Sequence, residues 1–112
     1  MKLTCEDQEQ FSVLHLKGEF ADDDGEKLRQ AVRERLDAGT VHDIVLDMAE
    51  LQFIDSQGLE AMLWVQENCT EKLGQLRLAA CPENITTILQ LTRLADQFAR
   101  HDDVEAAIRS LA

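Results

Sequence analysis

The chain has 112 residues, 45% of them hydrophobic and 29% charged, and its 22 acids against 11 bases give a formal net charge of −11 at pH 7. The length fits one domain, and the hydrophobic share is sufficient for a packed core. The acidic balance argues against a nucleic-acid partner and against docking on an anionic membrane, because both interactions depend on clustered lysine and arginine.

Two strands and a helix are predicted first. Residues 11–20, FSVLHLKGEF, combine strand-forming apolar residues with a turn signal at Gly18, and residues 3–6 suggest a shorter strand that pairs with them. Residues 21–39 predict an amphipathic helix, with three acids at its positive end and Gly39 in the place of a C-terminal cap.

A buried strand and a second helix follow. Residues 42–48, HDIVLDM, contain an unbroken apolar run, which is typical of a strand covered on both faces in a parallel sheet. Residues 58–74 have apolar positions at helical spacing, and Gly74 predicts the end of that helix. Residues 75–81 alternate like a further strand.

The last third predicts two more helices. Pro82 suits the first turn of one helix, and Phe98 marks a possible final strand. Residues 101–112 carry an apolar stripe, and Asp102 with Glu105 resembles a capping box. The resulting order, β-β-α-β-α-β-α-(β)-α, predicts an α/β fold with a largely parallel or mixed sheet and right-handed crossovers. It leaves the strand order open.

The remaining bulk features favour a cytoplasmic protein of one domain, residues 1–112. Apolar runs are far shorter than the roughly 20 residues that span a bilayer, and the first ten residues lack an apolar signal core. Cys5, Cys69 and Cys81 are scattered and form no CxxC motif, which predicts three reduced thiols.

Enzymatic interpretations have little support. His15, His42 and His101 lie far apart in sequence and none is beside a nucleophile, so a Ser-His-Asp triad is not marked, although one could still assemble in space. Neither GxGxxG nor a Walker A motif occurs, and the acids at 22–24 are typical of a solvated helix start rather than a metal site. We therefore expect no catalytic residue, metal, cofactor or small-molecule ligand.

Residues 53–60, FIDSQGLE, are the most informative stretch. Asp55 or Ser56 can cap the following helix, a contribution of about 1 kcal/mol, and we expect Ser56 in this role. Gly58 in the first turn costs roughly 1 kcal/mol relative to alanine, which indicates a close approach of the backbone to its own sheet or to a partner. A serine at such a junction is exposed enough for a kinase to reach.

FIDSQGLEAML resembles the signature of the STAS domain family (sulfate transporter and anti-sigma factor antagonist), roughly F-[IM]-D-[ST]-[STA]-G-L-G-x-L-L. KGEFADDDGEKLRQAV, HDIVLDMAELQFID and QLRLAACPENITTILQLTRLADQF are similar to further segments of that family, in the same order, and HDDVEAAIRSL resembles its closing helix. The resemblance implies a single domain with a central mixed sheet and about four helices packed mainly on one side.

The resemblance also implies a non-catalytic switch. In anti-sigma factor antagonists, the serine after the motif's aspartate is phosphorylated by a partner kinase that also sequesters a sigma factor, and a serine phosphatase resets the protein. Carried over, Ser56 is the phosphorylation site, and the expected partner contacts are Asp22, Asp55, Ser56, Gln57, Gly58 and Leu59.

Three positions depart from the family pattern. Gln57 replaces a small residue, Glu60 replaces a common glycine, and Asp22 is offset by one from the aspartate that many antagonists have after GEF. The alternative interpretation is therefore a STAS docking or scaffold subunit of a transporter or signalling complex, without a phosphorylation switch.

Overall fold

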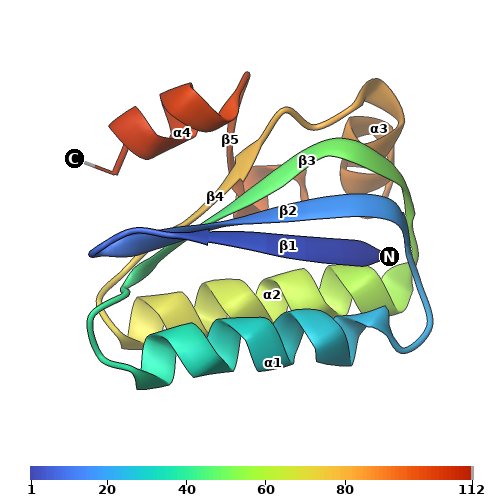
Figure 1. Ribbon diagram of the computed structural model, residues 1–112. Coiled ribbons are helices and arrows are strands. Elements are labelled where there is room, and N and C mark those ends of the chain that lie inside the picture. Colours follow the sequence, from blue (N-terminus) through green and yellow to red (C-terminus); the bar gives the residue numbers. More distant parts are fainter. Residues whose placement is uncertain (112) are drawn as a thin grey trace.

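Strands and helices alternate along residues 1–111, which are the residues that the computed structural model describes (Figure 1). The sequence patterns predicted this order of elements. Their bounds are β1 Lys2–Asp7, β2 Phe11–Phe20, α1 Asp24–Asp37, β3 Asp43–Ile54, α2 Ser56–Glu71, β4 Leu76–Ala79, α3 Glu83–Leu91, a 3-10 turn Ala95–Gln97, β5 Ala99–His101 and α4 Val104–Arg109.

The five strands form one mixed sheet whose spatial order is β1-β2-β3-β4-β5. Strand β1 pairs with β2 in an antiparallel arrangement, and the pairs from β2 to β5 are all parallel. Each parallel connection contains a helix, as parallel pairing requires. The strand order, which the sequence left open, is therefore the order of the chain itself.

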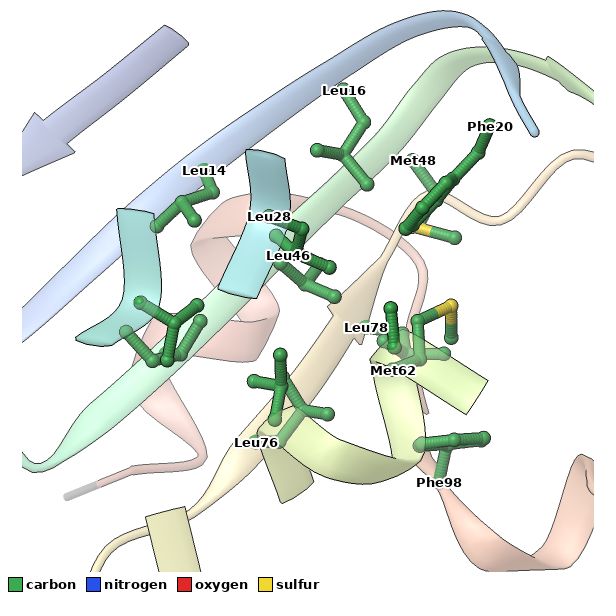
Figure 2. Close-up of a cluster of buried hydrophobic side chains, with 14 of the residues drawn as sticks. Leu14, Leu16, Phe20, Leu28, Leu46, Met48, Met62, Leu76, Leu78 and Phe98 are labelled. Carbon is green, nitrogen blue, oxygen red and sulfur yellow. The ribbon is translucent and has the colours of Figure 1, made fainter. Parts of the chain in front are cut away.

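The two faces of the sheet are covered unequally. Leu14 and Leu16 of β2 point into the larger core cluster, where buried residues of α1, α2 and α3 also pack (Figure 2). Val13, which precedes Leu14 in the strand, packs on the opposite face with Ala107 of α4. Figure 1 shows α1 and α2 together below the sheet and α4 above it. The predicted α/β fold, with a mixed sheet and helices mainly on one side, is confirmed.

Strand β3 is the centre of this arrangement. Ile44, Val45 and Leu46 have no exposed surface, so the unbroken apolar run does belong to a strand covered on both faces. The strand continues six residues beyond Met48, because register shifts in the β2–β3 pairing keep it beside β2 to the end.

The end of α2 differs from the prediction. The helix ends at Glu71, and Leu73 rather than Gly74 has the left-handed conformation, with φ 63°. The Gly74 N–H donates to the Cys69 carbonyl at 2.8 Å, which closes the helix end. Glycine is required at 74 because a Cβ there would lie 1.6 Å from the His42 carbonyl oxygen.

The predicted capping box of the last helix is wrong. The N-cap of α4 is Asp103, whose side chain accepts a hydrogen bond from the Ala106 N–H at 2.7 Å. Glu105 is then only the second helical residue, too early to close a box with Asp102. The apolar stripe is confirmed, because Val104, Ala107 and Ile108 belong to one cluster.

Two further expectations concern the membrane and the thiols. No helix within residues 1–111 has both the length and the apolar character needed to cross a bilayer. The three cysteines are free thiols, as predicted, and burial raises the pKa of Cys69 to about 12.

Candidate interaction site at the amino terminus of helix α2

The FIDSQGLE segment lies where the parallel strands β2 and β3 end side by side. Phe20, the last residue of β2, pairs with Ile54, the last residue of β3. The backbone N–H of Asp55 continues this pairing by donating to the Phe20 carbonyl at 3.1 Å. Helix α2 begins at Ser56, so the segment occupies the carboxyl edge of the sheet, where binding sites of α/β proteins are commonly found.

Asp55 is the N-cap of α2 and ties two segments together. One carboxylate oxygen accepts the Gly58 N–H at 2.9 Å, and the other accepts the Asp22 N–H at 3.0 Å. These bonds, from Asp22 first and then Gly58, lower the pKa of the Asp55 carboxyl below its ordinary value. The cap is therefore Asp55, and the prediction that Ser56 caps the helix is wrong.

Asp22 presents its backbone rather than its carboxylate to this cap. It lies between β2 and α1 with φ 55°, a left-handed conformation that aspartate tolerates better than most residues. Its side chain is exposed. Two residues on, the Asp24 carboxylate accepts the Ala21 N–H at 3.1 Å, which stabilises the same turn. The acids at the start of α1 thus shape the loop that meets Asp55.

Ser56 differs from the other serines of the chain. It is exposed at the first position of α2, and its hydroxyl makes no hydrogen bond to any residue from 1 to 111. Ser12 is fully buried and donates to the Asp7 carboxylate at 2.7 Å. Ser110 is half-buried and donates to the Ala107 carbonyl at 2.6 Å. Among the three serines of the sequence, Ser56 is the one whose hydroxyl is both exposed and free.

Gly58 and Leu59 face the protein interior. A Cβ on Gly58 would lie 2.6 Å from Cγ1 of Ile54 and 3.0 Å from the Phe20 carbonyl oxygen. Of the two close approaches that the sequence allowed, the structure therefore contains the one to the protein's own sheet. Leu59 is 5% exposed and belongs to the larger core cluster. These two residues hold the helix start against the strand ends.

The exposed part of the site is polar and acidic. Gln57 and Glu60 are exposed beside Ser56, and Asp22 is exposed across the Asp55 carboxylate. A partner approaching this edge therefore meets one free hydroxyl, one amide and acidic groups. Such a surface suits recognition by a protein with basic groups.

Phe53 was not identified from the sequence as a candidate contact. Its side chain is 44% exposed, and it lines a surface hollow with Ile88 and Thr87 of α3. Alternation could not indicate this exposure, because Leu51 and Ile54 are both buried although they lie three residues apart.

The histidines do not gather at Ser56. His15 Nδ1 and Nε2 lie 2.6 Å from carboxylate oxygens of Asp47 and Glu6. His42 lies in the loop before β3, and its backbone N–H donates to the Gln10 carbonyl. His101 closes β5, and its Nε2 is buried without a hydrogen-bond partner among the described residues. Within residues 1–111, no histidine is hydrogen-bonded to Ser56, so the arrangement that a Ser-His catalytic pair requires is not found.

Comparisons with known proteins agree on one family. The model of the STAS domain matches residues 2–107. The structure of a putative anti-sigma factor antagonist from Thermotoga maritima superposes with a TM-score of 0.88 at 18% identity, covering 97% of this chain and 93% of that one. A sulfate transporter family protein from Wolinella succinogenes gives 0.78 at 17% identity, covering 90% and 84%.

The anti-sigma factor antagonist SpoIIAA matches in two states. Its unphosphorylated form has a TM-score of 0.84 at 21% identity, covering 97% of this chain and 96% of that one. The phosphorylated form of the Bacillus protein has 0.76 at 21% identity, covering 97% and 99%. At these identities, the structural similarities establish the fold.

Proposed function

This chain belongs to the STAS domain family, and from that membership we propose that it is a cytoplasmic anti-sigma factor antagonist-like regulator of transcription, switched by phosphorylation of Ser56. In its unmodified form it binds an anti-sigma factor that is also a serine kinase, so that the sigma factor is released. Phosphorylation ends this binding, and a serine phosphatase restores it. The domain itself carries out no catalysis.

The accessibility of Ser56 is the observation that carries this proposal. A kinase needs a serine hydroxyl that is exposed and not engaged in a structural hydrogen bond, and Ser56 is the serine that meets both conditions. Ser12 and Ser110 are each held by hydrogen bonds. The similar protein SpoIIAA exists in a phosphorylated form, which supports the same chemistry here.

The proposed partner surface is the exposed edge around the helix start. Asp22, Ser56 and Gln57 provide exposed side chains, and Asp55 holds them in place through its two hydrogen bonds. Gly58 and Leu59 contribute by fixing the helix against the strands, so that a partner meets a rigid backbone. Binding to a preorganised surface avoids the entropy cost of ordering a loop.

Electrostatics explain why a phosphate on Ser56 would switch binding. It adds about −1.5 to −2 charges beside Asp55 and Glu60. Asp55 already occupies the Gly58 N–H, one of the first-turn donors that would otherwise stabilise the phosphate. The new charge therefore faces the partner. A loss of roughly 2 to 4 kcal/mol would weaken binding about thirty- to a thousandfold.

Phosphorylation can be tested on the intact protein with each anti-sigma kinase encoded in its genome and ATP. We expect mass spectrometry to locate one phosphate, on Ser56, and Ser56→Ala to abolish it. Ser110→Ala is the matched control and should be modified as wild type is. Phosphate on another residue, or none with any of these kinases, would contradict the proposal.

Binding tests the switch directly. We expect Ser56→Ala to bind the kinase as wild type does, and Ser56→Asp to bind about tenfold or more weakly, since the single charge is smaller than that of phosphate. Calorimetry with the purified kinase measures both dissociation constants. Equal affinities for the two variants would rule out a charge switch at this position.

The alternative is a docking or scaffold subunit of a transporter or signalling complex. Two observations favour it: exposed Gln57 and Glu60 alter the surroundings of Ser56, and a sulfate transporter family protein shares the fold. A transporter permease encoded beside this gene, with binding to that permease unaffected by Ser56→Asp, would establish this alternative.

A further inference from the structure

One histidine spans three strands of the sheet on the face opposite α1 and α2. His15 is at the middle of β2, in register with Thr4 of β1 on one side and Asp47 of β3 on the other. Its Nδ1 lies 2.6 Å from Oδ2 of Asp47, and its Nε2 lies 2.6 Å from Oε1 of Glu6. A single ring therefore joins the edge strand to the central strand.

The chemistry of imidazole restricts how this arrangement can be satisfied. A neutral ring has one N–H donor and one lone pair, whereas an ionised carboxylate only accepts hydrogen bonds. Both short contacts are satisfied at once only when His15 is protonated and donates from both nitrogens. Loss of the proton leaves one carboxylate facing a lone pair at hydrogen-bond distance.

We propose that protonated His15 forms a proton-dependent bridge between Glu6 and Asp47, which holds the edge strand β1 to the centre of the sheet. Strand β1 needs such a contact because it has a strand neighbour on one side only and none of its residues is buried. Glu6 lies near the end of β1, so its bond to His15 fixes that end. This role is independent of the function proposed for Ser56.

The charged groups around His15 are of both signs, and the two that contact its ring are carboxylates. The side-chain exposures of His15 and Asp47 are 32% and 19%, so their contact is partly shielded from solvent. Lys2, Lys17 and Glu50 line the same hollow, and Lys17 pairs with Glu50 at 3.4 Å. On the neighbouring helix α4, Arg109 pairs with Glu105. The carboxylates that contact the ring itself are thus Asp47 and Glu6.

The pKa of His15 determines the pH range in which the bridge between Glu6 and Asp47 forms. Partial burial lowers it, but the hydrogen bonds and charges of Asp47 and Glu6 outweigh burial and raise the pKa above its ordinary value. The stabilisation is therefore complete below the ordinary value of about 6.5 and is lost as pH rises through the raised value. Strand β1 should loosen as the pH rises through that raised value.

The test combines NMR titration of the histidine rings with amide hydrogen exchange in the full chain. We expect the His15 ring to titrate above the ordinary histidine value of about 6.5. Protection of the β1–β2 amides, corrected for intrinsic exchange, should fall by about tenfold for each unit by which folding raises the pKa. His15→Gln should remove this pH step, and His42→Gln should retain it.

Two results would overturn the proposal. One is a His15 ring that titrates at or below the ordinary value of about 6.5. The other is a His15→Gln protein whose β1 protection has the same pH profile as wild type. The ring titration needs only wild-type protein, so it decides the question even where His15→Gln does not fold. Loss of phosphorylation at Ser56 would leave both measurements unchanged.

Discussion

At the scale of single residues, the Asp55 carboxylate joins two segments that are distant in sequence. Replacing it with alanine removes the cap and the bond to the Asp22 N–H, and we expect a loss of about 1–3 kcal/mol in the free energy of unfolding. Asp55→Asn should lose less, because its carbonyl oxygen can still accept from Gly58. Urea denaturation measures both. Asp23→Ala is the control, since Asp23 precedes α1 without a side-chain capping bond.

The pKa of Asp55 gives the same carboxylate a pH signature. The N–H groups of Asp22 and Gly58 lower that pKa, so the stabilisation is present above the ordinary value of about 3.9 and is lost as pH falls through the lowered value. We expect the stability of wild type to decline more steeply in this acidic range than that of Asp55→Asn. If urea denaturation shows that the stabilities of wild type and Asp55→Asn decline in parallel, the hydrogen bonds of the Asp55 carboxylate are not acid-sensitive.

At the scale of elements, the start of α2 is fitted to the ends of β2 and β3. Alanine normally stabilises a helix relative to glycine, yet Gly58→Ala would place a methyl group 3.0 Å from the Phe20 carbonyl oxygen. We expect it to lower the free energy of unfolding by about 1–3 kcal/mol, as overpacking does. Thermal and urea unfolding measure the loss.

Gly25→Ala in α1 is the matched control for this element. Its added methyl group would lie 3.2 Å from Cβ of Ala61 and beside the flexible end of Arg29, so a small adjustment can accommodate it. We expect a change close to zero. If both variants were equally destabilised, the fit at Gly58 would not be the specific cause.

At the scale of the whole molecule, the net charge of −11 is the dominant feature. Excess acids repel one another in the folded protein, and salt screens this repulsion. We expect the urea midpoint at neutral pH to rise as sodium chloride is added. The association rate with a basic partner should fall over the same range, because salt also screens the attraction. A midpoint that falls with salt would mean that favourable ion pairs outweigh the excess charge.

How far the sequence predicts this fold depends on the range of the interactions. Strand β2 was predicted at its observed bounds, because alternation and the apolar run are local signals. Strand order was not predictable, since a crossover helix can carry the chain to either neighbour. The extension of β3 beyond Met48 was not predicted from residue patterns, because the buried residues Met48, Leu51 and Ile54 follow at intervals of three instead of two.

The site shows the same division. Asp55, Ser56 and Gly58 were identified from one short segment, but Ser56 was expected as the cap, whereas the cap is Asp55. The second bond of the Asp55 carboxylate comes from the Asp22 N–H, which is 33 residues away in sequence, and no local pattern reveals it. The close neighbours of Gly58 are Ile54 and Phe20, and the pairing that brings Phe20 there is not visible in the local sequence. Asp102 and Asp103 posed the same ambiguity, and there too the choice was wrong.

The sequential strand order has a consequence for synthesis of the protein. Each strand pairs with the one translated just before it, so the sheet can grow in one direction as the chain leaves the ribosome. The residues that hold the Ser56 site, namely Phe20, Asp22, Ile54, Asp55 and Gly58, all precede the end of α2 at Glu71. A nascent chain therefore contains every contact of its recognition edge before β4 and β5 have been made.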